Sequence, residues 1–251
     1  MKLTNQLTIR GYARTSAERA DLYLEKSSEL LAILEAEEKF LTVDLWGEDR
    51  KSEVVSAQLC MTSHSLWLAA VSMAVSGHVA AVPALLRTSI ESMCYASLIA
   101  ANHSLAEAWG KKLSSKTWTN RFNEKFKNPI KRAEAKVGEI YSIPDQRIYN
   151  CYLNMIDFGA HPNEALVSRN FLDMEQAEDE TWSGTYAVFH EHPSQHADLG
   201  VLMCADVGLA LCWLACALYE RLGQWAPLRL DDLEMRLQAV VADHRNLYGS
   251  L

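Results

Sequence analysis

Residues 201–218 have the sequence VLMCADVGLALCWLACAL and carry a single charged side chain, Asp206. The stretch lacks proline and has one glycine, so little in it would interrupt a helix. A membrane-spanning helix needs about 20 strongly apolar residues, whereas this run holds an aspartate and many Ala, Cys and Gly residues. It therefore predicts a helix buried in a protein core, with Ser194 as its N-cap and Gly223 as its stop signal.

A second apolar stretch, Leu66 to Ala101, contains His78, Arg87 and Glu91 and also predicts core helices. The 251-residue chain has 11 Gly and 6 Pro, which leaves little material for turns and favours long helices. We expect an all-α fold in a single helical domain, residues 1–251. Two short segments near 170–190, residues 171–174 and 185–190, are the candidates for a small two-stranded hairpin.

The expected helices follow from apolar periodicity and from cap and break signals. They cover residues 16–45, 52–76, 79–102, several short pieces within 104–143, residues 145–158, 194–222 and 231–247. Breaks are expected at Asn128-Pro129 and at Ile143-Pro144, because the residue before a proline disfavours helical geometry.

Charge and cysteine content bound the function. The net charge of −8 argues against a general nucleic-acid or membrane binder. All six cysteines lie in apolar segments without a CxxC pair, which indicates buried thiols in a reducing cytoplasm. The N-terminus lacks an apolar signal core. We therefore expect a cytoplasmic protein that does not bind membranes and, because no nucleotide or metalloprotease motif is present, one that needs no cofactor.

One segment departs from the acidic average. Lys111 to Lys136 holds nine Lys or Arg residues against two glutamates, with aromatic residues between them. This pattern makes RNA a candidate partner. The alternative is that Trp118, Phe122 and Phe126, four residues apart, face the core, while the basic face attracts the acidic residues 173–180 of the same or another subunit.

Two motifs together resemble an uncharacterised bacterial family of HEPN-like helical proteins. The first is residues 77–91, GHVAAVPALLRTSIE; the second is a tyrosine-containing helix, Tyr149 to Tyr152, that leads to residues 157–163, DFGAHPN. The resemblance implies a bundle of long antiparallel helices that forms a homodimer. It also implies a bacterial defence or toxin–antitoxin context, in which many related proteins are metal-independent RNases.

The RNase signature of that wider family is an Arg followed by a His after four to six residues. None of the eight histidines is preceded by an Arg at that spacing; the nearest pair, Arg236 and His244, has seven residues between. The chain therefore departs from the catalytic pattern, which favours a binding role. An RNase with an atypical Arg/His site remains the enzyme alternative.

Arg87 and Glu91 lie one helical turn apart in an otherwise apolar stretch. Burial makes such charges expensive unless they are paired. One interpretation is a charged site where Arg87 binds a carboxylate or phosphate. The other is an intrahelical salt bridge, or an Arg that reaches the surface or a dimer partner.

Asp157 and His161 flank the end of the tyrosine helix, close to Tyr152. The Asp could orient the His as a general base, or both could satisfy backbone groups at a helix end. The resemblance places His161 near Arg87 and Glu91. Our candidate ligand-binding residues are therefore Arg87, Glu91, Tyr152, Asp157 and His161, for a protein partner or a small anionic ligand.

His190, His192 and His196 form a histidine cluster in the sequence. Three imidazoles could bind a catalytic metal ion, which would make the chain a metal hydrolase. However, no recognised zinc spacing is matched, and the stretch around His192-Pro193 is typical of a surface loop. We therefore expect no metal site here.

Overall fold

The computed structural model describes residues 8–45, 52–141, 143–160, 170–176, 182–218 and 225–249. It confirms the all-α bundle with a small β-hairpin. The helices are α1 (Ile9–Leu24), α2 (Glu29–Lys39), α3 (Val54–Val75), α4 (Val82–Ala101), α5 (Ser104–Gly110), α6 (Lys116–Lys125), α7 (Pro129–Ile140), α8 (Arg147–Met155), α10 (Gln195–Cys216) and α11 (Trp225–Tyr248). π-helical turns extend α2 over Phe40–Asp44 and α8 over Ile156–Ala160, and a short 3-10 turn, Val79–Ala81, precedes α4.

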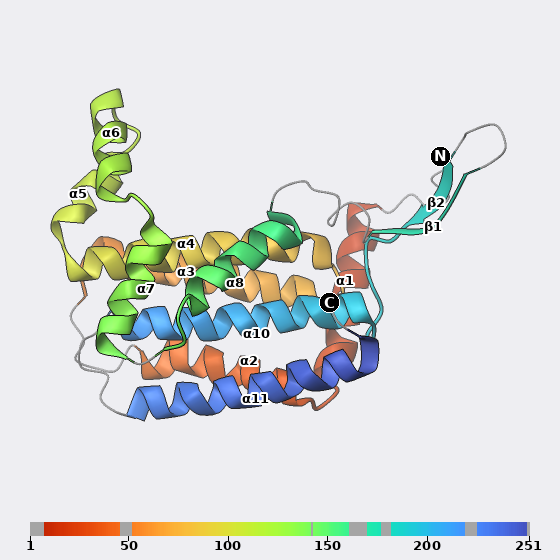
Figure 1. Cartoon of the computed structure of the whole chain (residues 1–251). Helices are drawn as coiled ribbons and strands as arrows, with labels where there is room; N and C mark the ends of the chain where they lie inside the picture. The colour runs from red at the N-terminus through yellow and green to blue at the C-terminus, as the bar shows by residue number, and fades with distance from the viewer. Residues whose placement is uncertain are drawn as a thin grey trace.

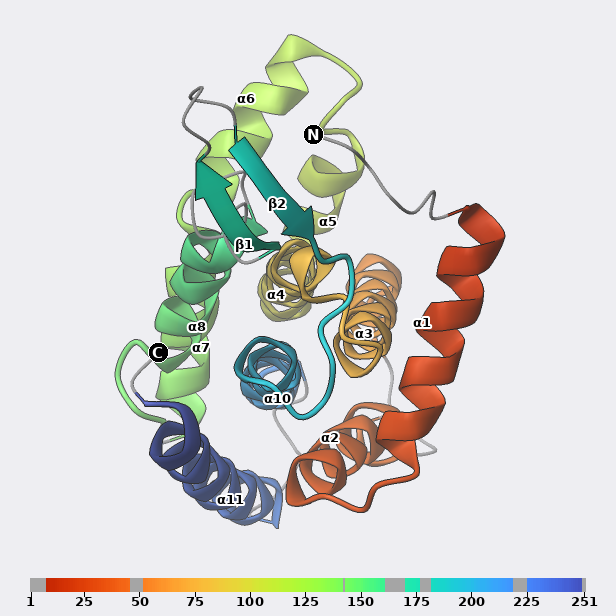
Figure 2. The ribbon, with the colours of Figure 1, turned by 90° about the vertical axis from the view of Figure 1, so that its right-hand side faces the viewer.

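Helix α10, the stretch that predicted the fold, is the central element (Figure 2). It packs against α2, α3, α4 and α11, with further contacts to α7 and α8. Ser194 caps it as predicted: its side chain accepts a hydrogen bond from the backbone N–H of Ala197. Trp67 of α3 anchors the centre, because its indole N–H donates to the carbonyl of Cys204 at 2.8 Å.

Helices α3 and α4 form an antiparallel hairpin with the most extensive contact in the molecule (Figure 1). Ser63 and Ser89 lie where the two helices cross, and each hydroxyl donates to the other residue's carbonyl, at 2.8 and 2.7 Å. Gly77 makes the connecting turn at φ +79°. Its backbone carbonyl also accepts a 2.8 Å hydrogen bond from the N–H of His190, so a side chain at position 77 would clash with the backbone there.

The prediction of one continuous helix over residues 16–45 is wrong, because the structure has two helices there, α1 and α2. The chain breaks after Leu24, and the Ser28 hydroxyl caps α2 by accepting from the N–H of Leu31. The apolar periodicity continues across this break and so does not reveal it. The break forms because a serine hydroxyl can replace a backbone carbonyl as the hydrogen-bond acceptor of a helical N–H group. The helix predicted over residues 52–76 begins at Val54, and its N-cap is Glu53, whose carboxylate accepts a hydrogen bond from the N–H of Ser56.

The remaining boundaries shift by a few residues. The final helix begins at Trp225 rather than near Asp231, and the predicted breaks at Asn128-Pro129 and Ile143-Pro144 fall between α6, α7 and α8. The hairpin pairs β1 (Phe171–Gln176) with β2 (Trp182–Tyr186) in antiparallel register, at the end of the molecule opposite α6 (Figure 1).

Among the described residues, two helices are long and apolar enough to cross a membrane, α3 and α10. In α10 that apolar window is 94% buried by the surrounding helices, as in the core helix of a bundle. In α3 only 33% of it is buried, so most of this helix faces outwards.

Candidate functional site

Arg87 and Glu91 form the ion pair that their spacing predicts. Arg87 Nε donates to Glu91 Oε1 at 3.0 Å, and both side chains are partly exposed, at 24% and 30%. The intrahelical salt bridge is therefore the interpretation that the structure supports. An ion pair at this degree of exposure contributes modestly to stability.

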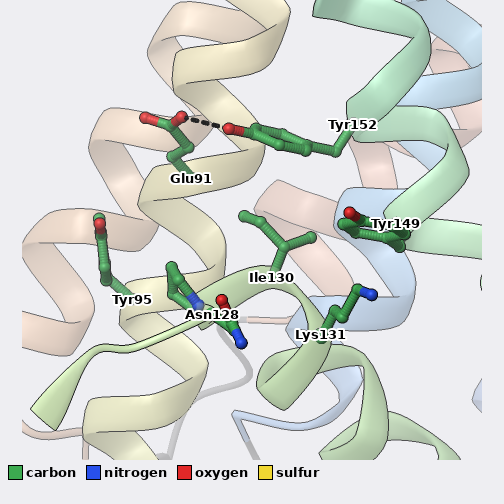
Figure 3. Close-up of a pocket in the computed structure, with 8 residues that line it drawn as sticks. Glu91, Tyr95, Asn128, Ile130, Lys131, Tyr149 and Tyr152 are labelled. Carbon is green, nitrogen blue, oxygen red and sulfur yellow. Dashed lines mark hydrogen bonds between the residues drawn. The ribbon is translucent and has the colours of Figure 1, made fainter. Parts of the chain in front are cut away.

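Tyr152 reaches this pair from α8. Its hydroxyl donates to Glu91 Oε1 at 3.0 Å (Figure 3). The Arg87 guanidinium carbon lies 5.7 Å from the centre of the Tyr152 ring. Burial, and then the negative charge of Glu91, raise the pKa of Tyr152. The phenol therefore stays protonated and donates, so that Glu91 is stabilised by a cation on one side and a hydroxyl on the other.

Glu91 and Tyr152 line a cavity of about 430 Å³ between α4, α7 and α8, which we call the α4–α7–α8 cavity (Figure 3). Its volume falls within the range of small-molecule sites. The lining residues are Glu91, Tyr95, Asn128, Pro129, Ile130, Lys131, Tyr149 and Tyr152.

Lys131 supplies a positive charge to this cavity. Its ammonium group lies 4.3 Å from the centre of the Tyr149 ring, a cation–π geometry. Glu91 is the sole carboxylate among the described lining residues, and Arg87 already neutralises it. The two charged lining residues, Glu91 and Lys131, therefore balance, and Arg87, which pairs with Glu91 from outside the lining, makes the local sum positive.

The N-terminus of α7 opens into the same cavity, since the lining includes Asn128, Pro129, Ile130 and Lys131. Asn128 adopts left-handed backbone angles, φ 51° and ψ 56°, and its side chain makes no capping hydrogen bond. The N–H groups of Ile130 and Lys131 have no intrahelical acceptor because the helix has only just begun. Such groups attract anions, and the helix dipole adds to the attraction.

Tyr95 forms the opposite wall. Its ring packs edge-to-face on Phe126, with centroids 5.2 Å apart, and also contacts Phe122. Burial, followed by the charge of Glu91, raises the pKa of Tyr95, so this hydroxyl also stays protonated. The cavity therefore combines aromatic surfaces with hydrogen-bond donors.

The structure thus brings together three of the five candidate residues, Arg87, Glu91 and Tyr152. Asp157 lies exposed on the π-helical turn after α8 and is not among the described lining residues. His161 lies outside the described residues, so its predicted proximity to Arg87 stays a prediction.

Sequence reasoning missed Lys131, Tyr149, Tyr95 and Asn128. Lys131 is one of nine Lys or Arg residues in the basic segment Lys111–Lys136, and its spacing does not distinguish it from the others. The Asn128-Pro129 break was used only to end a helix. A proline at the first helical position also marks a helix start, and that signal, with a lysine two residues later, could have indicated an anion site.

The three histidines of the predicted cluster do not converge. His190 and His196 have ring centres 5.1 Å apart, but His192 turns away, towards Asp198 Oδ1 at 3.0 Å and the carbonyl of Ala74 at 3.1 Å. The described part of the chain contains no group of three His, Cys, Asp or Glu side chains arranged for a metal ion.

A second charged cluster lies inside the bundle. Arg147 of α8, whose side chain is 12% exposed, pairs with Asp206 of α10 at 2.7 Å and with Glu234 of α11 at 3.1 Å. The predicted core helix therefore tolerates Asp206 because an arginine from another helix compensates it. This cluster ties three helices together.

Glu37 of α2 is fully buried beside this cluster, and neither of its carboxylate oxygens has a hydrogen-bond partner among the described residues. The carboxylate sits against Gly208 of α10, where even a methyl group would collide with it. Burial first, and then the charges of Asp206 and Glu234, raise the pKa of Glu37 well above its ordinary value.

The basic segment Lys111–Lys136 begins directly after α5 and runs through α6 into α7; α5 and α6 project from one end of the bundle (Figure 1). Phe122 and Phe126 are buried, as the core interpretation requires, whereas Trp118 is half-buried with Lys111 and Arg121 near its ring. The β-hairpin lies at the other end, so its described acidic residues do not meet this surface within one chain.

Comparison of the chain with protein-family models, with curated proteins and with solved structures gave no match. The fold and the site define an all-α bundle with an aromatic-lined cavity that holds Lys131 and the N-terminus of α7. The function is therefore argued from the chemistry of that cavity.

Proposed function

We propose that the chain binds a small anionic ligand in the α4–α7–α8 cavity. The observation that carries the proposal is the meeting of Lys131 and the uncapped N-terminus of α7 at a cavity whose carboxylate is already paired with Arg87. A carboxylate or phosphate group would accept hydrogen bonds from the backbone N–H groups and from the ammonium.

The rest of the ligand is flat and largely apolar. Tyr95, Tyr149 and Ile130 offer ring faces and an aliphatic surface, which suit an aromatic or unsaturated group. The cavity of about 430 Å³ accommodates a molecule of one or two rings rather than a polymer segment. The ligand class is thus an aromatic carboxylate or phosphate monoester.

The proposal is for a binding protein. Among the described lining residues, Glu91 is held by Arg87 and Tyr152, and burial raises the pKa of Tyr152 and of Tyr95, which keeps both hydroxyls protonated. None of these groups is poised to act as a nucleophile or general base. The RNase alternative and a role for the basic surface in RNA contact stay predictions that the proposal does not use.

Phenyl phosphate is a suitable probe because it carries both a ring and a dianionic group. In isothermal titration calorimetry it should bind more tightly than inorganic phosphate, which lacks the ring, and phenol, which lacks the charge, should not bind measurably. Equal affinity for phenyl phosphate and phosphate would contradict a role for the tyrosine walls.

Lys131→Gln should weaken phenyl phosphate binding about tenfold or more, because a hydrogen bond to a charged group is worth roughly 1.5–3 kcal/mol. Lys136→Gln is the matched control: it removes the same charge from the same helix at a position outside the cavity, where the lysine pairs with Glu139. An equal loss in both variants would show that only the general charge of the chain matters.

Glu91→Gln should act in the opposite direction. Removing the carboxylate takes a negative charge from the cavity wall and releases Arg87 from its ion pair, so phenyl phosphate should bind more tightly. Weaker binding in Glu91→Gln would instead show that the ligand is held by this carboxylate and is a cation.

A further inference from the structure

Helix α3 is an outer helix without a single charged residue. Its sequence, VVSAQLCMTSHSLWLAAVSMAV, contains no Asp, Glu, Lys or Arg. Three of its large apolar side chains are nevertheless exposed: Val54 at 67%, Met61 at 60% and Leu68 at 41%. Surface helices normally carry charged residues on their outer face, as α1, α2, α6, α7 and α11 do here.

The exposed residues form one continuous face. Val54, Met61 and Leu68 are seven residues apart and so lie on the same side of the helix. Small or uncharged side chains fill the space between them: Gln58, Thr62, Ser65, Ala69 and Ser72, all exposed. We call these eight residues the neutral face of α3. Its short side chains would let a second backbone approach closely.

The inner side of α3 is already used. Ser63, Trp67, Ala70 and Ala74 lie opposite the neutral face and are buried against the bundle. α1 crosses only the end of α3 near the α3–α4 turn, where Tyr12 contacts His78 (Figure 1). The rest of the neutral face, centred near Ser65, is exposed on the described molecule.

We propose that the neutral face of α3 docks against the same face of a second copy of this chain, around a two-fold axis near Ser65. A two-fold contact places a surface against itself, so any charge on it would meet a like charge. The neutral face carries no charge along its whole length, whereas the outer faces of the neighbouring helices are charged. Depletion of charged residues is also a feature of interface cores.

A lipid bilayer fits this face less well. Helices that lie on membranes combine an apolar face with Lys or Arg side chains that bind anionic headgroups. α3 has no such residues, it carries Gln58, Thr62, Ser65 and Ser72 on the outer face, and the chain as a whole has a net charge of −8. The self-complementary protein contact is therefore the better match.

The exposed span from Val54 to Ser72 is about 27 Å long at 1.5 Å per residue. One helix pair of that length buries an area at the low end of specific interfaces, so the dimer should dissociate at micromolar concentrations. Sedimentation velocity from about 1 to 100 µM should resolve both species. The expected mass at the upper end is twice the 28.2 kDa of the chain.

Ser65→Glu places two carboxylates against each other at the crossing and should raise the dimer Kd about 100-fold, since an unpaired charge is then buried. Met235→Glu is the control, because Met235 is 66% exposed on α11, away from this face. Ser65→Lys should weaken the homodimer equally, and mixing it with Ser65→Glu should restore a heterodimer. That restoration also excludes misfolding as the cause of dissociation.

Three results would overturn the proposal. The first is a wild-type monomer at about 100 µM, above the range in which such interfaces dissociate. The second is a dimer that Ser65→Glu leaves intact. The third is co-sedimentation of the wild type with phosphatidylcholine vesicles, abolished by Ser65→Glu, which would assign the neutral face to a membrane.

Discussion

The buried carboxyl of Glu37 makes a quantitative prediction about stability. Because burial raises the pKa of Glu37 well above its ordinary value, the folded chain keeps a proton there that the unfolded chain loses near pH 4.5. The folded state is therefore most stable, with respect to this group, below pH 4.5. Its contribution decreases as the pH rises towards the folded pKa, at about 1.4 kcal/mol per pH unit.

Glu37→Gln replaces the neutral carboxyl with a neutral amide of the same size and removes this linkage. As the pH rises from 5 to 7, the free energy of unfolding of the variant should increase relative to that of the wild type, by at most about 1.4 kcal/mol per pH unit. The measurement is urea denaturation followed by circular dichroism at several pH values. Comparing the two proteins cancels the other titrating groups that they share.

Glu35→Gln is the matched control, since Glu35 is exposed on the same helix and stays hydrated in both states. Its stability profile should run parallel to that of the wild type. If the Glu37→Gln profile is also parallel from pH 5 to 7, Glu37 is ionised in the folded protein and the assignment of a neutral buried carboxyl is wrong.

Three further substitutions test the packing. Gly77→Ala should destabilise the fold by at least about 2 kcal/mol, because position 77 has φ +79° and a methyl group would lie 1.9 Å from the carbonyl oxygen of His190; Gly138→Ala, on the open face of α7, should instead stabilise by about 0.5–1 kcal/mol. Urea unfolding would measure both, and equal effects would contradict the proposed turn. Arg147→Met should destabilise by about 3–5 kcal/mol, because it leaves Asp206 and Glu234 without their cation; a thermal melt unchanged from the wild type would show that water already solvates both carboxylates.

The overall class of the fold could be predicted from sequence, whereas local interruptions could not. The uncharged run around Asp206 predicted the central helix because only a core position buries so many apolar residues. The break between α1 and α2 was missed because apolar spacing continues across it, and the Ser28 cap that decides it is a single local hydrogen bond.

The candidate site could be predicted only where its contacts are local in sequence. The i,i+4 spacing of Arg87 and Glu91 is local, so their pairing followed from sequence. The contact between Glu91 and Tyr152 joins residues 61 positions apart, which no spacing rule predicts. The resemblance to HEPN-like proteins implies only that His161 lies near Arg87 and Glu91, and it stays a prediction. Lys131 enters the cavity through the packing of α7 against α4 and α8, which no spacing rule predicts.

Glu37 illustrates a signal that was present but unused. It lies on the same helical face as Leu30, Ile33 and Leu34, at the core spacing, so the periodicity that predicted the helix also placed this carboxylate inside. Its partner Gly208, far away in sequence, provides the space for it. A charged residue that falls at the core spacing of a helix can therefore indicate a buried ionisable group.

A crystal structure of the chain with phenyl phosphate would test the central claim most directly. The account predicts the phosphate at the N-terminus of α7, within hydrogen-bonding distance of Lys131 and the N–H groups of the first turn, with the phenyl ring against Tyr149 or Tyr95. A phosphate bound instead to the exposed lysines of α6, with the α4–α7–α8 cavity unchanged, would contradict it.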